Sequence, residues 1–268
     1  IELIVDPPPD RPIDDEVRVT PRPAPTRTSA PEPTPVASLA PGAPAPLPTA
    51  SPSPMPSPTP VPQRVRVDVN LYKRPDARFI TEFHKDWCAV AGTQMVLAAH
   101  GKAALTQAFQ RKLASRVGEW ESRRDSINGE WGPSAMVKAL DAYGVPGYEV
   151  RIYETRADAL RDAARAISKF NAPVILLAWR GAHTWVMTGY RADGDPLLFD
   201  DVKVAGAYIL DPWYPRVSSI WGPSDPPGTY QDAAEMRRNY LPWKRPEGKY
   251  PTRDGLFVAV VPTVRLDR

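Results

Sequence analysis

Residues 83–97 read Phe-His-Lys-Asp-Trp-Cys-Ala-Val-Ala-Gly-Thr-Gln-Met-Val-Leu and contain the only cysteine of the chain, Cys88. Apolar residues recur at helical spacing, which predicts a helix from about residue 87 to residue 100. Asp86 is the expected N-cap and Gly101 the residue that ends the helix. A thiol in the first helical turn lies at the positive end of the helix dipole, which favours the reactive thiolate. The alternative is that Cys88 is a small buried apolar residue.

The first 63 residues differ in composition from the rest of the chain. They hold 20 of the 34 prolines, and no Phe, Tyr or Trp precedes Tyr72. Such a segment cannot bury enough apolar surface to offset the entropy of folding, so we predict a disordered Pro/Ser/Thr-rich stalk over residues 1–63. Residues 64–268 carry every aromatic side chain and have the length of one domain with its own core.

Charge and hydropathy narrow the classes of partner. The formal net charge is +3 and no block of Lys or Arg occurs, which argues against a nucleic-acid partner. No apolar run reaches the roughly 20 residues that cross a bilayer, so we expect no membrane contact by the domain itself. Because a Pro/Ser/Thr stalk usually holds a domain away from a surface, we expect an extracellular or cell-surface bacterial protein with a signal peptide or anchor upstream. One cysteine gives no evidence of compartment.

The pattern after the stalk predicts an α+β domain. Besides the helix that carries Cys88, helices are expected over residues 105–117, 133–143 and 155–170. Strands are expected over residues 148–153, 173–179, 183–190, 207–211 and 255–261. Because helices dominate the first half and strands the second, we expect a mainly antiparallel sheet packed against the Cys-bearing helix.

A thiolate nucleophile needs a base that holds and returns a proton, and imidazole suits that role near neutral pH. The chain has three histidines. His183 follows the turn at residues 180–182 and begins a strand, where a sheet can present an imidazole to a facing helix. His100 is read as a helix cap, and His84 as a loop residue or a contact at the rim of the site. His183 is therefore the expected base.

A carboxylate at the end of the neighbouring strand would fix the tautomer of that imidazole. Asp211, which precedes Pro212, fits this position. Asp200 and Asp201 remain rivals, although Pro196 and the paired acids are typical of a surface turn. One Cys and three scattered His give no metal-ligand spacing, so we predict no metal site and no cofactor.

In this order the residues resemble the papain-like cysteine peptidases: Cys88 at a helix start, Gly-Ala-His at 181–183 leading into a strand, and Asp211-Pro212 at the end of the next. Within them the chain is similar to the double-glycine leader peptidases, which process bacteriocin precursors, and their stand-alone secreted relatives. The resemblance covers about residues 72–261. It implies a papain-like fold and a peptide or protein substrate. It also implies that Cys88 attacks a peptide or isopeptide bond to form an acyl-thioester, with His183 as base and Asp211 orienting it.

One position departs from the family pattern. Those families usually place a Gln six residues before the nucleophile, and this chain has Glu82 there. The resemblance puts Glu82 and the backbone N–H of Cys88 in the oxyanion hole, but an ionised carboxylate would repel an oxyanion. Losing such a donor costs about 10²- to 10³-fold in rate. Either burial keeps Glu82 protonated, or another donor replaces it, or the enzyme is weak or inactive.

Three further readings stay open. The interval from His183 to Asp211 is longer than in the leader peptidases, which implies an insertion around residues 193–204. The chain has no P-loop motif, so the resemblance does not imply coupling to a transporter. Residues 213–251 are rich in Trp, Tyr and Pro, and either wall a substrate cleft or pack onto the core. The alternatives to a peptidase are a cell-wall peptide amidase or acyltransferase, and a papain-like binding module that has lost catalysis.

Overall fold

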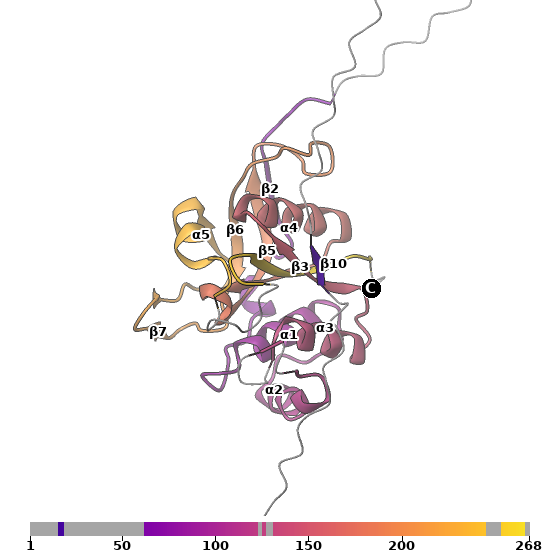
Figure 1. Cartoon of the computed structure of the whole chain (residues 1–268), viewed down its shortest axis with the longest axis vertical. Coiled ribbons are helices and arrows are strands. Elements are labelled where there is room, and N and C mark those ends of the chain that lie inside the picture. Colours follow the sequence, from indigo (N-terminus) through magenta and orange to yellow (C-terminus); the bar gives the residue numbers. More distant parts are fainter. Residues whose placement is uncertain (1–15, 19–61, 123–124, 127–130, 245–252, 266–268) are drawn as a thin grey trace, which may run out of the picture. The chain divides into compact units, whose positions relative to one another are not determined.

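The computed structural model describes residues 16–18, 62–122, 125–126, 131–244 and 253–265. Figure 1 shows its elements in chain order. The strands are β1 (Glu16–Arg18), β2 (Val67–Asn70), β3 (Tyr148–Tyr153), β4 (Val174–Ala178), β5 (His183–Ala192), β6 (Val204–Leu210), β7 (Val217–Ser218), β8 (Gly222–Pro223), β9 (Thr229–Asp232) and β10 (Phe257–Pro262). The α-helices are α1 (Cys88–Ala99), α2 (Gln107–Ala114), α3 (Pro133–Ala142), α4 (Arg156–Phe170) and α5 (Ala233–Asn239). Short 3₁₀ turns are η1 (Pro75–Arg78), η2 (Val117–Glu119) and η3 (Trp179–Gly181).

The main sheet has the strand order β1-β3-β10-β4-β5-β6-β9, and β2 pairs with β5 beside this path. The described pairs are antiparallel except β1 with β3, which is parallel. The last strand, β10, therefore lies inside the sheet between β3 and β4. This arrangement confirms the expected α+β class with a mainly antiparallel sheet.

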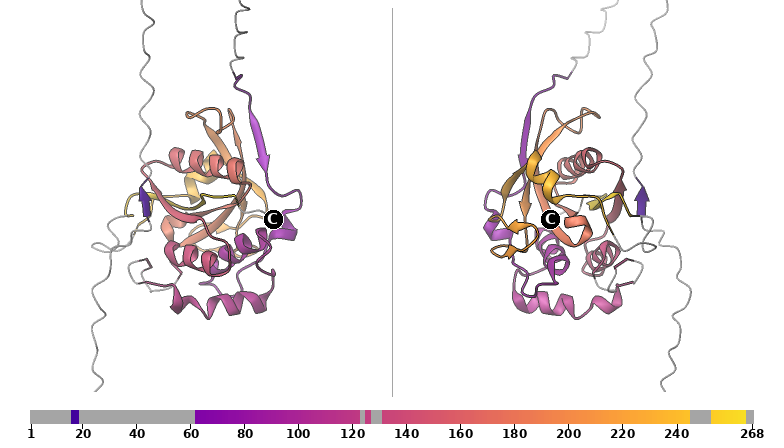
Figure 2. Two further views of the ribbon diagram at one scale, coloured as in Figure 1. Left: turned by 90° about the vertical axis from the view of Figure 1, so that its right-hand side faces the viewer. Right: turned by 60° about the vertical axis from the view of Figure 1, so that its left-hand side comes forward.

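Helices cover both faces of the sheet, as the two views in Figure 2 show. Side chains alternate along β4: Ile175 and Leu177 join the core under α1, α2 and α3, whereas Leu176 joins the core under α4. A strand buried on both faces reads as one continuous apolar run, and for this reason residues 174–178 show no polar alternation. The Cys-bearing helix packs on the sheet as expected, and α4 forms a third layer.

A glycine sets how closely α1 approaches β5. A Cβ at Gly92, one helical turn after Cys88, would lie 2.5 Å from Cγ2 of Thr184 on β5. That separation is shorter than any real carbon–carbon contact, so only glycine permits this packing. The close approach brings the start of α1 near the start of β5, where His183 lies.

Most of the predicted elements are confirmed. Strand 148–153 matches β3, and the N-cap hydroxyl of Thr155 accepts a hydrogen bond from the backbone N–H of Asp158 at the start of α4. The helix at Pro133 ends before Gly144, whose φ is +78°, as a C-terminal glycine requires. The elements that the sequence did not predict are short and lack a periodic pattern of their own: β1, β2, β7, β8, β9 and α5.

The segment assigned to the stalk contributes one strand. Residues Glu16–Arg18 form β1 and pair in parallel with residues 150–152 of β3. The structure therefore differs from the expectation that residues 1–63 take no part in the domain, because an exposed edge strand can accept any short extended segment as a partner. The rest of the predicted stalk, up to residue 61, lies outside the described residues.

Candidate active site

Cys88 is the first residue of α1. The N-cap is Trp87, which makes no side-chain capping bond, and the first turn holds no acidic residue. The N–H groups of a first helical turn have no partner within the helix, and the dipole makes this end positive. The start of α1 is therefore a place where negative charge on sulfur or on an oxyanion is stabilised.

The prediction that Asp86 is the N-cap of α1 is wrong, because the N-cap is Trp87. The backbone N–H of Asp86 donates to Nδ1 of His84 at 3.4 Å, and the carboxylate of Asp86 lies 3.5 Å from the same nitrogen. Asp86 thus belongs to the turn before the helix, and its side chain is largely exposed. Because no carboxylate caps α1, the positive helix end stays available to the site.

His183 is the first residue of β5 and is 2% exposed. One of its ring nitrogens, Nε2, lies 2.7 Å from Oδ1 of Asp211, the residue that follows β6. The same oxygen accepts the backbone N–H of Trp213 at 2.9 Å. Asp211 therefore fixes the imidazole through Nε2, and Nδ1 is the nitrogen left for Cys88.

The two rival carboxylates lie elsewhere. Asp200 pairs with Arg165 at 2.7 Å, and Asp201 pairs with Arg64 at 2.8 Å, both near the surface turn between β5 and β6. Each carboxylate is thus held by a surface arginine. The structure brings Asp211, and not these two, to His183.

The charge state of His183 follows from its neighbours. Burial by itself lowers the pKa of this imidazole, but the carboxylate of Asp211 and the sulfur of Cys88 more than offset that effect and raise the pKa to about 10. A protonated His183 beside Cys88 stabilises a negative charge on the sulfur. This is the ion-pair form that a cysteine nucleophile needs.

Glu82 faces the same site and is fully buried. Its Oε1 accepts a hydrogen bond from Nη1 of Arg216 at 2.8 Å, whereas Oε2 has no hydrogen-bond partner among the described residues. Burial raises the pKa of Glu82 to about 8, against the lowering effect of the charges on His183 and Arg216. The ion pair and the burial act in opposite directions, and we take burial to dominate because Arg216 is 35% exposed and so partly screened. Burial therefore favours the protonated form of the Glu82 carboxyl, whereas the contact with Arg216 favours the ionised form.

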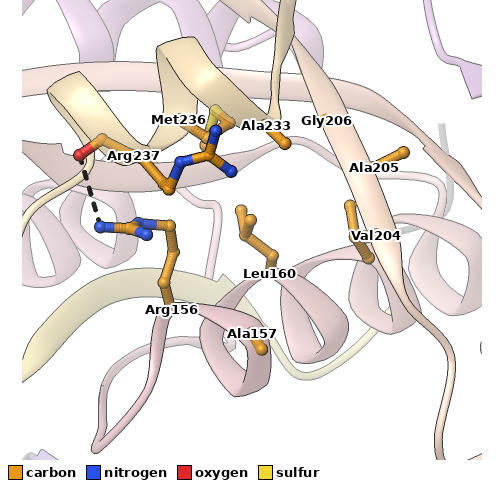
Figure 3. A pocket seen from close by; sticks show the side chains of 9 residues that line it. All are labelled: Arg156, Ala157, Leu160, Val204, Ala205, Gly206, Ala233, Met236 and Arg237. Atoms are coloured by element: carbon orange, nitrogen blue, oxygen red, sulfur yellow. Dashed lines mark hydrogen bonds between the residues drawn. The ribbon is translucent and has the colours of Figure 1, made fainter.

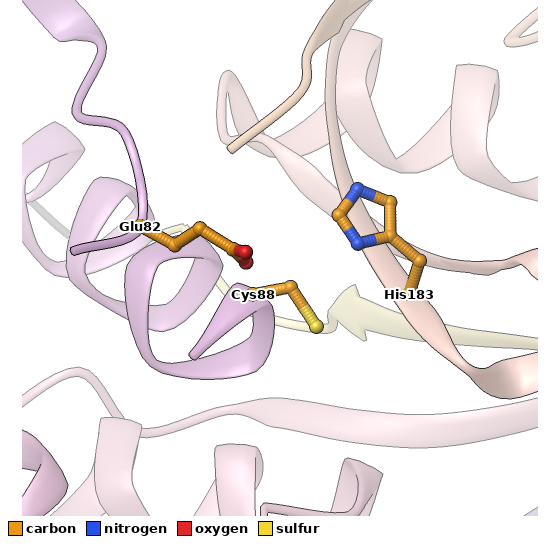
Figure 4. Close-up of side chains that lie close together, drawn as sticks. All are labelled: Glu82, Cys88 and His183. Atoms are coloured by element: carbon orange, nitrogen blue, oxygen red, sulfur yellow. The ribbon is translucent and has the colours of Figure 1, made fainter. Parts of the chain in front are cut away.

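Figure 4 shows how the three groups lie: the carboxyl of Glu82 and the ring of His183 approach the start of α1, where Cys88 lies, from different elements. One donor atom from each residue falls within 4.8 Å of the other two. These residue types also bind metals, but His183 holds a proton and Glu82 already contacts a cation, Arg216. The arrangement fits a nucleophile, a base and an oxyanion donor better than a metal centre.

Aromatic rings enclose the histidine. Trp179 stacks on His183 with ring centroids 4.0 Å apart, and Trp213 meets the same ring edge-on at 6.4 Å. The turn that carries Trp179 has positive φ values at Trp179 (50°) and Arg180 (62°), which non-glycine residues adopt at a cost. The backbone thus accepts strain where it places an indole over the imidazole.

The other two histidines are not part of this site. Nε2 of His100 lies 3.1 Å from the hydroxyl of Tyr148, at the end of α1 where a capping role was expected. His84 is exposed and packs near Trp87, with ring centroids 5.5 Å apart. Among the described histidines, only His183 contacts Cys88.

Sequence reasoning missed Arg216 and Trp179. Arg216 follows β6 by several residues in a stretch with no periodic pattern, and it reaches Glu82 across 134 residues of sequence. For Arg216 the only available signal was the Trp-, Tyr- and Pro-rich composition of residues 213–251, which does not single out one residue. Trp179 ends the predicted strand 173–179, and nothing in that pattern indicates that its ring contacts the site.

A thiol at a helix start, an imidazole at a strand start and a carboxylate bonded to that imidazole define a cysteine-peptidase-like site on a papain-like α+β fold. The chain belongs to the Peptidase_C39-like family, which matches residues 66–239 and so more than half of the sequence. One solved structure similar to the chain is described as "Crystal structure of a double glycine motif protease from AMS/PCAT transporter in complex with the leader peptide". The identity is 19% and the TM-score 0.34, over 69% of this chain and 91% of that one. No curated protein matches the chain.

A pocket of about 190 Å³ lies apart from this site, between α4, β6 and α5. Figure 3 shows Arg156 and Arg237 at its side and Leu160 and Met236 among the residues that line it. It contains no nucleophile and no group that could act as a base at neutral pH. We therefore locate the candidate chemistry at Cys88 rather than in this pocket.

Proposed function

We propose that the protein is a cysteine-type peptidase that hydrolyses a peptide or isopeptide bond through an acyl-thioester. The observation that carries the proposal is the juxtaposition of Cys88, His183 and Glu82 within 4.8 Å, with His183 bonded to Asp211. A nucleophile, a proton carrier and an orienting carboxylate are the parts that acyl transfer to a thiol requires.

The reaction divides into two steps. The Cys88 thiolate attacks the carbonyl carbon, and the resulting tetrahedral oxyanion collapses when protonated His183 gives its proton to the leaving amine and the C–N bond breaks. Neutral His183 then takes a proton from water, the hydroxide attacks the thioester, and the carboxylic acid leaves as the thiolate re-forms. Asp211 keeps the imidazole in one orientation throughout.

The oxyanion is stabilised by two donors in this proposal. One is the backbone N–H of Cys88 at the uncapped start of α1. The other is the carboxyl O–H of Glu82, because Arg216 occupies Oε1 and leaves the proton for Oε2. A neutral carboxylic acid can donate in this way where a carboxylate would repel.

We further propose that the substrate is a peptide or protein and that the domain works outside the cell or at its surface. The support for this placement is the Pro/Ser/Thr-rich composition of residues 1–63. None of the helices in the described part of the chain combines the length and the apolar character needed to span a bilayer.

Alkylation of Cys88 tests the proposal, because the chain has one cysteine and the mass of the intact protein reports its modification. Iodoacetamide should react much faster with the native protein than with the protein unfolded in guanidinium chloride at the same pH. His183→Ala should abolish the difference while Ser168→Ala, remote from the site, should preserve it. A native rate equal to or below the unfolded rate would exclude a working nucleophile.

The second candidate is a papain-like binding module without catalysis, which the Glu82–Arg216 ion pair favours because an ionised Glu82 disables the oxyanion hole. If Cys88 is activated towards iodoacetamide and yet neither the wild type nor Glu82→Gln cleaves any member of a peptide library, this candidate replaces the peptidase. Cleavage by either protein excludes it.

A further inference from the structure

A small hairpin stands beside the site and exposes apolar side chains. We define the apolar hairpin as residues 217–223, in which Val217 pairs with Pro223 and Ser218 with Gly222. Within the described residues, large apolar side chains are exposed at Val65, Phe83, Leu197, Leu198, Val217, Ile220 and Val264. The most exposed are Ile220 at 80% and Val217 at 69%. Figure 1 shows β7 projecting from the body of the domain.

Hydrogen bonds give the apolar hairpin a defined shape. The hydroxyl of Ser218 accepts the backbone N–H groups of Ile220 and Trp221, at 3.2 and 3.1 Å, and so closes the turn. At the base, the hydroxyl of Ser224 donates to the carbonyl oxygen of Arg216 at 2.8 Å. The exposed aliphatic side chains are therefore held on a structured element rather than on an unsupported loop.

Two contacts join the apolar hairpin to the candidate active site. Trp221 stacks on Trp179 with the rings almost parallel and 5.8 Å between centroids, and Trp179 in turn stacks on His183. Arg216, at the base of the hairpin, donates to Glu82. The hairpin is thus held next to His183 through the ring of Trp179, and next to Glu82 through Arg216.

An exposed apolar residue also lies on the Glu82 side of the site. Phe83 directly follows Glu82 and is 39% exposed. Its backbone N–H is held by the side chain of Gln110 at 2.8 Å, so its position is fixed. Phe83 and the residue before the hairpin, Arg216, both adjoin Glu82, and exposed apolar side chains gathered beside functional residues are more typical of a binding surface than of a chance distribution.

We propose that the apolar hairpin binds an apolar stretch of the peptide substrate next to the scissile bond. This inference rests on the proposed function and names its substrate class: peptides with aliphatic residues beside the cleaved bond. Continuity with the site favours a peptide over a lipid surface, because Trp221 and Arg216 tie the hairpin to His183 and Glu82. The two exposed aliphatic side chains, Val217 and Ile220, offer an apolar area similar in size to one or two side chains of a bound peptide.

The test compares two electrophilic peptides that alkylate Cys88, acetyl-Leu-Leu-Leu and acetyl-Ser-Ser-Ser chloromethyl ketones, with iodoacetamide as the small reference. The wild type should react faster with the leucine peptide than with the serine peptide. The double variant Val217→Ser/Ile220→Ser should lose about tenfold or more of this preference, since each change removes a buried aliphatic contact on binding. Its rate with iodoacetamide should not change, because no residue of the site is altered.

The matched control is Leu197→Ser/Leu198→Ser, which makes the same kind of change at exposed residues, 50% and 60% exposed, in the turn between β5 and β6. This control should keep the preference for the leucine peptide, and thermal midpoints should show that both variants are folded. The proposal is overturned if the hairpin variant keeps the preference, or if both variants lose it equally.

Two further outcomes are decisive. Binding of the wild type to phosphatidylcholine vesicles, lost in the hairpin variant while the peptide preference persists, would make the hairpin a membrane contact and overturn the proposal. A slow iodoacetamide rate in the wild type would instead count against the proposed peptidase activity. The peptide-to-iodoacetamide ratio therefore separates failure of the hairpin proposal from failure of the function on which it rests.

Discussion

The carboxyl of Glu82 and the guanidinium of Arg216 lie 2.8 Å apart, although 134 residues separate them in sequence. Glu82 is fully buried and Arg216 is 35% exposed. Burial pushes the carboxyl towards its neutral form while the arginine favours the charged form. The outcome of this competition decides whether the position usually held by Gln donates to an oxyanion or repels it.

Glu82→Gln should extend activity to higher pH. In the wild type, activity should fall as pH rises through about 8, where Glu82 loses its proton and ceases to donate. With Gln the donor cannot titrate, so the alkaline limb should move towards about 10, where His183 loses its proton. The measurement is the pH profile of kcat/KM on a cleaved peptide.

The control for that experiment is Glu82→Ala, which removes the donor and should lower activity by about 10²- to 10³-fold below a pH of about 8, where Glu82 of the wild type still carries its proton. If the Ala variant keeps its activity and the Gln variant loses it, Glu82 is not the donor. Another group would then fill the oxyanion hole.

Arg216→Gln should move the alkaline limb of the wild type upward as well, for a different reason. The positive charge of Arg216 lowers the pKa of Glu82, so its removal raises that pKa and keeps the carboxyl protonated to higher pH. In the Glu82→Gln background the same change should leave the limb where it is. Arg165→Gln, at an arginine that pairs with Asp200, serves as the matched control and should not shift the profile. A downward shift in Arg216→Gln would contradict the sign of this coupling.

Asp211→Asn should lower the pKa of His183 below about 10, since the charge of Asp211 is the largest influence that raises it. Asn keeps an oxygen that can accept from Nε2 and from the backbone N–H of Trp213, so orientation is retained while charge is lost. We expect a smaller loss of activity than in Asp211→Ala. Proton NMR titration of the imidazole C2–H resonances measures the shift, and an unchanged His183 pKa would rule out this role for Asp211.

Gly92→Ala should impair catalysis more than folding. The added methyl would meet Cγ2 of Thr184 at 2.5 Å and force α1 away from β5. A displacement of about 1 Å at a reacting group can cost on the order of 10²-fold in rate. Thr184→Ser removes that methyl group, so the double variant Gly92→Ala/Thr184→Ser should recover most of the rate. Absence of rescue would show that the loss has another cause.

Truncation to start at Arg64 should leave the thermal midpoint nearly unchanged. The only contribution of the removed segment among the described residues is β1, a three-residue edge strand paired with β3. That pairing has to offset the entropy of closing the long connection from Arg18 to Val67. Scanning calorimetry of the full and truncated chains measures the difference, and a large drop would mean that the removed segment stabilises the domain by more than a three-residue edge pairing does.

Much of the secondary structure could be predicted from the sequence because it depends on interactions between residues a few positions apart. The hydroxyl of Thr155 and the N–H of Asp158 that it caps are three positions apart, and Pro133 and Gly144 bracket a helix by their own backbone preferences. Such interactions are local, so the chain specifies them before any tertiary contact forms. The reading of Cys88 as a residue at a helix start depends on the same kind of signal, as does that of His183 at a strand start.

Only the tertiary structure decided how these residues work together. The choice of Asp211 over Asp200 depended on which carboxylate the sheet brings to His183, and the contact of Arg216 with Glu82 depends on where the chain returns after β6. The exclusion of Asp86 from the cap likewise came from its turn with His84. Burial, and with it the protonation of Glu82, is a property of the packed domain, because residues far apart in sequence supply the atoms that exclude water from a carboxyl group.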